Sequence, residues 1–453
     1  MNLLEKRFLV VGTGKSGIAA AELLVSHQMQ VIIFDENPNL IAGDVWAQSK
    51  KLGMVPVVIG KLPDEVKEKI DICVLSPGVS IELPIIQELI NKGVIVWGEI
   101  ELAYRFGKGR IIAITGTNGK TTTTTLVGEI MKRQFSSVKV VGNIGIPYTT
   151  VVDDLSDESV VVAEISSFQL ETIDEFHPKV SAILNIQPDH LNRHHTMDNY
   201  IYTKEQILKN QVPDDVCILN FDDAITREIG TRAKSKVIFF STKEKLENGF
   251  YVQDDAIYRS NHGETTYWMN IYDMNLVGMC NVENVMAAMA ISEFMEVPRE
   301  VVVSTIREFK AVEHRIEFVA NKNGIVYYND SKATNPDAAI QGIRAMNRPT
   351  VLIGGGYDKG NDFDSWIQSF DDKVKLLILI GATAEKISES AKRNGLTAIR
   401  FASSLEEAME IAIQEASTGE AVLLSPACAS WGMFPNYEER GKLFKSIVHD
   451  IKE

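Results

Sequence analysis

Cysteine is scarce in this chain of 453 residues, which contains four cysteines and no Cys-x-x-Cys pair. Cys73, Cys217, Cys280 and Cys428 lie far apart along the sequence. The chain therefore lacks the ligand spacing of a zinc knuckle and the dense cysteine framework of a small disulfide-stabilised domain. We expect these four side chains to be buried thiols.

Long apolar runs are also missing, although 45% of the residues are hydrophobic. No stretch approaches the ~20 apolar residues that a membrane-spanning helix requires. The opening segment, MNLLEKRFLV, carries charge and leads directly into a glycine-rich loop, which differs from the layout of a secretory signal peptide. These features predict a cytoplasmic protein without a membrane partner.

Positive charge is in the minority, because 46 Lys and Arg face 61 Asp and Glu and the formal net charge is −15. A nucleic-acid-binding surface needs a basic face, so we expect no nucleic-acid partner. An anionic substrate must instead be met by local cations, metal ions or backbone amides. We expect a monomer.

Buried-strand patterns alternate with helical patterns along the chain, which is typical of parallel sheets. A central block begins with the strand RIIAIT and includes an alternating, antiparallel pattern between residues 249 and 270. We predict an α/β chain with a Rossmann-like N-terminal domain, a central P-loop ATPase-type domain with a mixed sheet, and a C-terminal Rossmann-like domain. The predicted domains are residues 1–98, 99–311 and 312–453.

The segment VVGTGKSG connects an apolar strand to a helix, and Gly12, Gly14 and Gly17 match the pattern G-x-G-x-x-G. Asp35 ends the next strand, at the distance expected for a ribose ligand. A helix N-terminus attracts a diphosphate but does not distinguish NAD from a UDP-linked substrate. Glycines that serve only a tight turn are a third possibility. The turn SPGVS, at residues 76–80, ends at the same edge of the predicted sheet and could line the same crevice.

A second glycine-rich loop, GTNGKT, follows the central strand RIIAIT and precedes a helix. Ile114 stands where the general Walker pattern has its first glycine, but the working parts remain. Backbone amides can cradle phosphates, Lys120 can reach the β and γ oxygens, and the Thr121 hydroxyl can bind Mg²⁺. A hydride-transfer enzyme has no use for this loop. We therefore expect ATP cleavage coupled to another reaction, with a substrate on the first loop.

Acidic and histidine residues follow other strands of the central block. Glu164 ends one strand, where a carboxylate can hold magnesium directly or through water. His190, beside Asp189, follows another strand, and a neutral histidine there either binds a second metal ion or makes an ordinary polar contact. His194 and His195 are adjacent and would diverge on most backbones, so we leave both out of the predicted site.

Three loops of the last block follow successive predicted strands. They are NDSKATNP, GGGYDKGNDF and SPACASWGMFPNYEERG, at residues 329–336, 354–363 and 425–441. Because parallel strands share a carboxyl edge, we expect the three loops to form one functional rim, although each alone could be an ordinary turn. Arg315, at the domain junction, is either a nucleotide contact or a solvated arginine.

Together these segments resemble the Mur ligase family, ATP-dependent amide-forming enzymes of bacterial peptidoglycan precursor synthesis. The resemblance rests on GTNGKT, EISSFQLE, NIQPDHLNRH, EHRIEF, NDSKATNP and GGGYDKG. Within the family, GTGKSG, SPGV and the long SPACASW loop are similar to the branch that adds D-glutamate, and the DNPR-type loop of diamino-acid-adding members is absent.

The resemblance implies that ATP phosphorylates the carboxylate of UDP-N-acetylmuramoyl-L-alanine and that D-glutamate then displaces phosphate, with Mg²⁺ as cofactor. The implied UDP-substrate residues are Gly14, Lys15, Ser16, Asp35, Glu36, Ser76, Pro77, Gly78 and Asn143. The implied ATP residues are Gly116, Thr117, Asn118, Gly119, Lys120, Thr121, Thr122, Asn281, Asn284, Arg315 and Asp330. The implied metal ligands are Thr121, Glu164, His190 and Lys204, the last as a carbamate. The implied D-glutamate residues are Thr334, Lys359, Ser430 and Tyr437. The predicted catalytic residues are Lys120, His190 and Lys204.

Other hypotheses remain at this point. Another Mur-type or folylpolyglutamate-type ligase would share the ATP loop, although the second of these leaves the first domain unexplained. A nicotinamide-dependent dehydrogenase would bind NAD at the first loop and ignore ATP. A non-catalytic nucleotide switch would hydrolyse ATP slowly and would not respond to amino acids.

Overall fold

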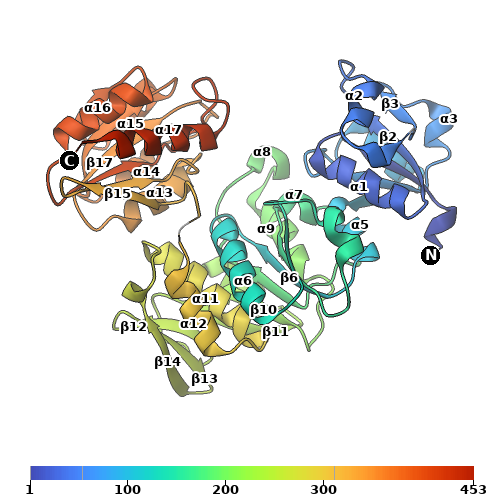
Figure 1. The fold of residues 1–453 in the computed structure, drawn as a ribbon, viewed down its shortest axis with the longest axis horizontal. Coiled ribbons are helices and arrows are strands. Elements are labelled where there is room, and N and C mark those ends of the chain that lie inside the picture. The colour runs from blue at the N-terminus through green and yellow to red at the C-terminus, as the bar shows by residue number, and fades with distance from the viewer. Residues whose placement is uncertain (1, 54, 311, 453) are drawn as a thin grey trace. The chain divides into compact units, whose positions relative to one another are not determined.

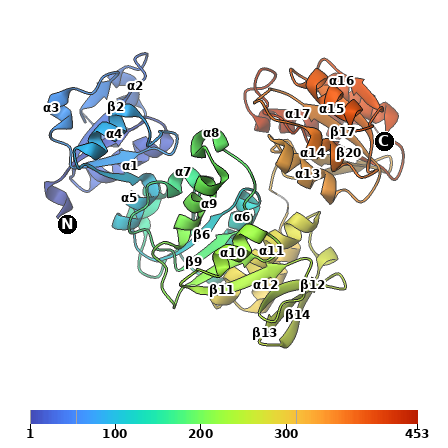
Figure 2. The ribbon, with the colours of Figure 1, turned by 180° about the vertical axis from the view of Figure 1, so that it is seen from behind.

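The computed structural model describes residues 2–53, 55–310 and 312–452 of the chain. They form two compact units, of which one runs to Met269 and includes Asn284–Thr305. The other contains Asn270–Glu283 and the chain from Ile306 onward. Strands and helices alternate around three sheets (Figures 1 and 2), which confirms the predicted three-part α/β fold. The predicted domain boundaries stay predictions, and Met1, Ala311 and Glu453 at the predicted domain ends lie outside the described residues.

The first sheet has five parallel strands in the order β3-β2-β1-β4-β5, drawn in blue in Figure 1. Its strands are β1 (Arg7–Val11), β2 (Gln30–Asp35), β3 (Val57–Ile59), β4 (Ile72–Leu75) and β5 (Ile95–Gly98). Its helices are η1 (Leu3–Glu5), α1 (Lys15–Ser26), α2 (Ala42–Ala47), η2 (Lys50–Leu52), α3 (Asp64–Lys67) and α4 (Pro84–Asn91). The chain leaves β1 toward β2 on one side and returns to β4 on the other. The loops after β1 and β4 therefore flank the topological switch point, where ligands bind in such sheets.

Strand β1 is a continuous apolar run in the sequence because both of its faces are buried. Phe8 and Val10 belong to one buried cluster, whereas Leu9 and Val11 belong to another. Successive side chains of a strand point to opposite faces, so both faces of this strand are covered.

The second sheet has nine strands in the order β14-β13-β12-β11-β10-β9-β6-β8-β7. Its strands are β6 (Arg110–Thr115), β7 (Val138–Gly142), β8 (Val160–Glu164), β9 (Val180–Ile183), β10 (Val216–Asn220), β11 (Lys236–Ser241), β12 (Gly249–Gln253), β13 (Ala256–Asn261) and β14 (Glu264–Asn270). Strands β6 to β12 pair in parallel, and β13 is antiparallel to β12. The predicted mixed sheet, with its antiparallel segment, is thus confirmed.

Helices connect these strands, and Figure 2 shows several of them in green and yellow. They are α5 (Glu99–Phe106), α6 (Lys120–Gln134), η3 (Tyr148–Asp154), α7 (Ser167–Leu170), α8 (Leu191–His194), α9 (Met197–Glu205), η4 (Gln206–Leu208), α10 (Ala224–Gly230), η5 (Ile271–Asp273), α11 (Met279–Phe294) and α12 (Arg299–Glu308). Strand β6 lies between β8 and β9, and both pairings are parallel. The segments that follow these three strands therefore meet at one edge of the sheet.

The third sheet has six strands in the order β15-β16-β20-β17-β18-β19. Its strands are β15 (Glu317–Lys322), β16 (Ile325–Asn329), β17 (Thr350–Gly355), β18 (Val374–Ile380), β19 (Ile399–Phe401) and β20 (Ala421–Leu424). Its helices are α13 (Pro336–Ala345), α14 (Asp364–Gln368), α15 (Ala384–Arg393), α16 (Leu405–Glu415) and α17 (Tyr437–Asp450). Strands β16, β20 and β17 are neighbours and run parallel, so the three predicted loops do emerge at one edge.

Cys73, Cys217 and Cys428 are buried free thiols, as predicted, whereas Cys280 is also free but partly exposed. Among the helices that the structure describes, none has the length and apolar character needed to cross a membrane.

Candidate functional site

The first glycine loop turns tightly between β1 and α1. Gly12 has a φ of +96°, and a Cβ atom at Gly17 would lie 1.9 Å from the Gly12 carbonyl oxygen. Both positions therefore require glycine. Helix α1 begins at Lys15 with the exposed Gly14 as its N-cap, where none of the side chains that the structure describes forms a capping hydrogen bond. The first amides of α1, including that of Ser16, are thus suited to an anion.

Asp35, predicted as a ribose ligand, has a contact that the sequence did not suggest. Its carboxylate accepts hydrogen bonds from the Thr13 amide at 3.0 Å and the Thr13 hydroxyl at 2.8 Å, so it braces the glycine loop. Glu36 beside it is exposed. The Ser76 hydroxyl, next to Pro77 and Gly78, donates to the Gly12 carbonyl at 3.4 Å. The glycine loop and the SPGVS turn are therefore in contact.

The second glycine loop lies between β6 and α6. Gly116 and Gly119 have φ values of +150° and +85°, in the region that favours glycine. The Lys120 ammonium donates to the carbonyl oxygens of Gly116 at 2.8 Å and Thr117 at 2.9 Å. The Asn118 amide donates to the Asn185 side chain at 2.8 Å. The segment after β9 thus holds the loop, and α6 begins directly behind it, with Thr121 and Thr122 in its first turn.

Helix α11 also contacts this loop through Asn284. The Thr123 hydroxyl donates to the Asn284 side-chain oxygen at 3.2 Å, and a Cβ atom at Gly119 would lie 2.2 Å from that oxygen. Asn281, in the other compact unit, donates to the Val277 carbonyl at 2.8 Å. The predicted contacts of Asn281 and Asn284 with adenosine stay predictions.

Glu164 ends β8 and is almost fully buried. One carboxylate oxygen accepts from the Asn143 side chain at 2.7 Å, and the other has no hydrogen-bond partner among the described residues. A buried carboxylate oxygen without a partner is costly, so this position suits a cation. Asn143, predicted to contact the substrate, is in this structure a support for Glu164.

Lys204, in α9, contacts the P-loop that follows β6. Its side chain is 1% exposed, and its ammonium donates to the Gly116 carbonyl oxygen at 2.9 Å. Burial, together with the nearby Lys120 ammonium, holds the pKa of Lys204 well below its ordinary value. Lys204, Lys120 and Glu164 are thus gathered around the end of β6.

His190 follows β9 and adopts a left-handed backbone conformation, with a φ of +54°. Its half-exposed ring lies 4.9 Å from the ring of Phe168, measured between centroids. Within the described ranges, no three His, Cys, Asp or Glu side chains form a group that could hold a metal ion. The predicted ligands include two such side chains, Glu164 and His190, so their role stays a prediction.

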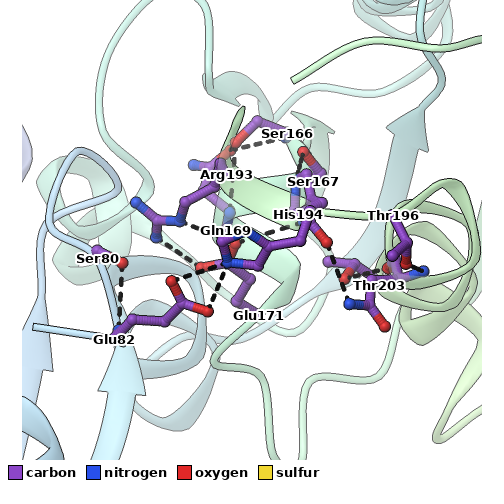
Figure 3. Close-up of polar contacts among 12 residues, drawn as sticks. Ser80, Glu82, Ser166, Ser167, Gln169, Glu171, Arg193, His194, Thr196 and Thr203 are labelled. Atoms are coloured by element: carbon purple, nitrogen blue, oxygen red, sulfur yellow. Dashed lines mark hydrogen bonds and ion pairs between the residues drawn. The ribbon is translucent and has the colours of Figure 1, made fainter. Parts of the chain in front are cut away.

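Arg193 and His194, both labelled in Figure 3, and the neighbouring His195 contact different partners. The buried ring of His194 lies 2.9 Å from the Ser167 hydroxyl, whereas His195 lies 3.0 Å from Glu82 of the first domain. Burial and the nearby His190 lower the pKa of His194 to about 4. The two histidines diverge, as the sequence predicted. Arg193, which sequence reasoning missed, pairs with Glu171.

The rim of the third sheet is held by a residue that the sequence analysis also missed. Arg440, in α17, is 1% exposed and donates to the Ser331 carbonyl oxygen at 2.7 Å and the Cys428 carbonyl oxygen at 3.2 Å. The Tyr357 amide donates to the Ala429 carbonyl oxygen at 2.9 Å. Hydrogen bonds thus connect all three loops into the single rim that was predicted.

Asp330 is buried behind this rim. One of its oxygens accepts from the Ser425 hydroxyl at 2.7 Å and the other from the Ile316 amide at 3.2 Å. Burial raises the pKa of Asp330 to about 7. Arg315 is partly buried, and its Nε has no hydrogen-bond partner among the residues that the structure describes. The predicted roles of Asp330 and Arg315 toward the nucleotide are not tested by these contacts.

The residues predicted to bind the amino-acid substrate lie in the same loops. Lys359 is exposed, and its ammonium lies 5.0 Å from the ring centroid of Trp431. Ser430 is buried, and Thr334 is partly exposed. Tyr437 begins α17, and its carbonyl oxygen accepts from the Ser331 hydroxyl at 2.8 Å.

The fold and the site together define a nucleotide-binding protein, with a P-loop on the central sheet and a glycine loop suited to an anion on the first. Three family models match the chain in order: "Mur ligase MurD-like, N-terminal domain" over residues 6–98, "Mur ligase middle domain" over 114–292, and "Mur ligase, glutamate ligase domain" over 314–428. The chain belongs to the Mur ligase family.

Curated relatives cover the full chain. The UDP-N-acetylmuramoylalanine–D-glutamate ligases of Lachnoclostridium phytofermentans and Lachnospira eligens are each 51% identical to this chain, and 100% of both sequences is covered. The enzyme of that name from Clostridioides difficile is 44% identical, again with 100% of each chain covered.

Solved structures show the same fold at lower identity. The MurF ligase of Acinetobacter baumannii is 18% identical, with a TM-score of 0.63 and 98% of this chain and 93% of that chain covered. The MurF ligase of Thermotoga maritima, solved in complex with ADP, is 15% identical, with a TM-score of 0.61 and 99% of each chain covered.

Proposed function

We propose that this chain is the ATP-dependent ligase that joins D-glutamate to UDP-N-acetylmuramoyl-L-alanine, through an acyl phosphate, in peptidoglycan precursor synthesis. The observation that carries the proposal is full-length identity of 51% to relatives of that name, together with an intact P-loop and an intact first glycine loop. Because both proposed nucleotide-linked substrates, ATP and the UDP compound, are cytoplasmic metabolites, we place the enzyme in the cytoplasm.

Lys120 and the loop amides would bind the triphosphate. In this structure the Lys120 ammonium donates to the carbonyl oxygens of Gly116 and Thr117. Phosphate oxygens bound in the loop would compete with these carbonyl oxygens for the ammonium. A carboxylate that approaches a triphosphate is strongly repelled. Fixed cations and backbone N–H groups offset that repulsion because they are already oriented toward the developing charge.

The residues around Glu164 fit a magnesium ion. One buried carboxylate oxygen of Glu164 has no hydrogen-bond partner in the described part of the chain, and such an oxygen is the kind of ligand that magnesium prefers. The Thr121 hydroxyl stands at the usual P-loop position. His190 and Lys204, the latter as a carbamate, would complete the predicted set. When bound, magnesium would neutralise charge on the phosphates.

Two displacements at the substrate account for the reaction. An oxygen of the L-alanine carboxylate attacks the γ-phosphorus, the bond from that phosphorus to the ADP oxygen breaks, and ADP leaves. The amine nitrogen of D-glutamate then attacks the acyl carbon. The bond from this carbon to the phosphate oxygen breaks, the nitrogen loses a proton to solvent, and amide and phosphate are released.

The rim of the third sheet would bind D-glutamate. The Lys359 ammonium supplies a positive charge for a carboxylate, and the Thr334 and Ser430 hydroxyls supply hydrogen bonds. Tyr437 would border the site. The hydrogen bonds of Arg440 and Tyr357 hold the loops that carry these residues.

Phosphate release from ATP in the presence of UDP-N-acetylmuramoyl-L-alanine tests the proposal against a panel of D- and L-amino acids. We expect release to depend on D-glutamate. Release with another amino acid would indicate a different ligase, and release that ignores all amino acids would indicate a nucleotide switch. Binding of NAD in place of uridine compounds would favour a dehydrogenase.

A further inference from the structure

Arg193 connects two segments whose spacing the proposed reaction requires to be fixed. It lies in α8, directly after His190, and its side chain is 16% exposed. The guanidinium donates to both carboxylate oxygens of Glu171, from Nε at 3.2 Å and from Nη2 at 2.6 Å. Figure 3 shows the Arg193 side chain directed toward the carboxylate of Glu171.

The same guanidinium contacts the first domain. Nη2 of Arg193 also donates to the Val79 carbonyl oxygen at 3.2 Å. Val79 packs in turn on the first glycine loop, because a Cβ atom at Gly12 would lie 3.1 Å from a Val79 methyl carbon. Arg193 thus reaches the backbone of the turn that supports the UDP-substrate loop.

On its other side, Arg193 packs against the ring of Phe168. Its guanidinium carbon lies 5.1 Å from the centroid of that ring, and the ring of His190 lies 4.9 Å from the same ring. Phe168 belongs to α7, whose N-terminus is fixed by a capping box between Ser166 and Gln169. Arg193 and His190 therefore both contact the Phe168 ring, which sits on a short, well-anchored helix, and the ring of His190 is tilted by 59° to that of Phe168.

The charge of Arg193 is already balanced. A bidentate arginine–carboxylate pair fixes the orientation of both side chains, and partial burial strengthens its hydrogen bonds. This arrangement suits a clamp between chain segments better than a phosphate ligand, because a phosphate would have to compete with Glu171 for the same donors.

We propose that Arg193 is a positioning residue, which sets the spacing between the UDP-substrate loop of the first domain and the His190 segment beside the ATP loop. The inference rests on the proposed function. Its consequence is that Arg193 aligns the substrate carboxylate with the γ-phosphate without touching either group. Loss of Arg193 should therefore slow the chemical step and leave both nucleotides bound.

Kinetics of Arg193→Ala test this role. A misplacement of about 1 Å costs on the order of 100-fold in rate, so we expect kcat to fall by about that factor. The KM for ATP and the Kd for UDP, measured with UDP itself, should change less than about threefold, because the clamp is not needed to hold either nucleotide. Arg193→Lys keeps the charge but loses the bidentate fork, so it should restore part of kcat.

Arg259→Ala is the matched control. Arg259 is also mostly buried, donates to Glu293 at 2.7 Å and lies 5.4 Å from the ring centroid of Phe250, but in β13, away from both loops. We expect a similar loss of thermal stability in the two variants, with kcat of Arg259→Ala within about twofold of the unmodified enzyme. His195→Gln, which removes the exposed pair with Glu82, should also change kcat less than about twofold.

The outcomes separate the two hypotheses. If the unmodified enzyme shows no D-glutamate-dependent phosphate release, the proposed function fails. If it does, and Arg193→Ala keeps normal kcat, loses UDP affinity in parallel with kcat, or loses no more activity than Arg259→Ala, the positioning role is overturned.

Discussion

At the scale of single residues, Lys120 carries the clearest prediction. It is the P-loop cation, and its ammonium lies on the loop carbonyl oxygens. Lys120→Ala should lower kcat at least about 1,000-fold, because the γ-phosphate loses its main protein cation. Lys132→Ala, on the exposed face of the same helix, removes a lysine that pairs with Glu129 and should leave kcat unchanged. Phosphate-release assays on both variants check this, and near-normal turnover of Lys120→Ala would refute the role of the loop.

Asp330 should make the stability of its unit depend on pH. Its pKa is raised by burial from 3.8 to about 7. The folded state therefore binds a proton more tightly than the unfolded state, and stability falls as pH rises from about 4 through about 7. The slope from this one group is at most about 1.4 kcal/mol per pH unit. Asp330→Asn should flatten the slope in urea unfolding measured at pH 5, 6 and 7, and an unchanged slope would contradict the burial argument.

At the scale of elements, the hairpin of β15 and β16 turns through two residues in left-handed conformations. Asn323 and Gly324 have φ values of +53° and +77°, and a Cβ atom at Gly324 would lie 2.6 Å from a Thr418 methyl carbon. Gly324→Ala should therefore lower the free energy of unfolding by about 1–2 kcal/mol. Gly43→Ala, within α2 and with open space around it, should instead be neutral or stabilising by up to about 1 kcal/mol. Thermal denaturation distinguishes the two, and equal effects would show that the turn is not strained.

The same hairpin shows which strands could be predicted from the sequence and which could not. Buried parallel strands such as β1 and β17 were found because they are continuous apolar runs. Edge strand β15 was missed because its burial does not alternate regularly, although the Asn-Gly pair after it is a strong hairpin signal. Strands that are half-exposed carry little hydrophobic pattern, so turn chemistry has to identify them.

The sequence could predict those residues of the candidate site that lie at or after the ends of strands. The P-loop, Glu164 and His190 come after three neighbouring parallel strands, which local pattern and topology could place together. The partners of Arg193 and Arg440 could not be predicted in this way. Each arginine contacts a backbone carbonyl far away in the sequence. In the sequence alone, an arginine in a helical pattern looks the same whether its side chain is buried or solvated.

At the scale of the whole molecule, the first two sheets share a hydrophobic core. One buried cluster includes Phe8 and Val10 of the first sheet and Ile111 and Val161 of the second. The glycine loop and the P-loop also lie in the same compact unit. We therefore expect UDP and ADP each to shift the same calorimetric unfolding transition to higher temperature. Each ligand should raise the free energy of that unfolding by about 2.7 kcal/mol at 100 times its Kd. A transition that responds to UDP but not to ADP would show that the two sheets unfold independently.

Trp431 gives this enzyme a built-in optical reporter. Of the five tryptophans, Trp97, Trp268 and Trp366 are buried and Trp46 is partly buried, whereas Trp431, beside Lys359, is 54% exposed. Acrylamide should quench the emission of Trp431 preferentially, and D-glutamate bound at the rim should shield it. Fluorescence would then detect compounds that occupy the amino-acid loops without a coupled assay, and Trp431→Phe would identify any signal that arises elsewhere.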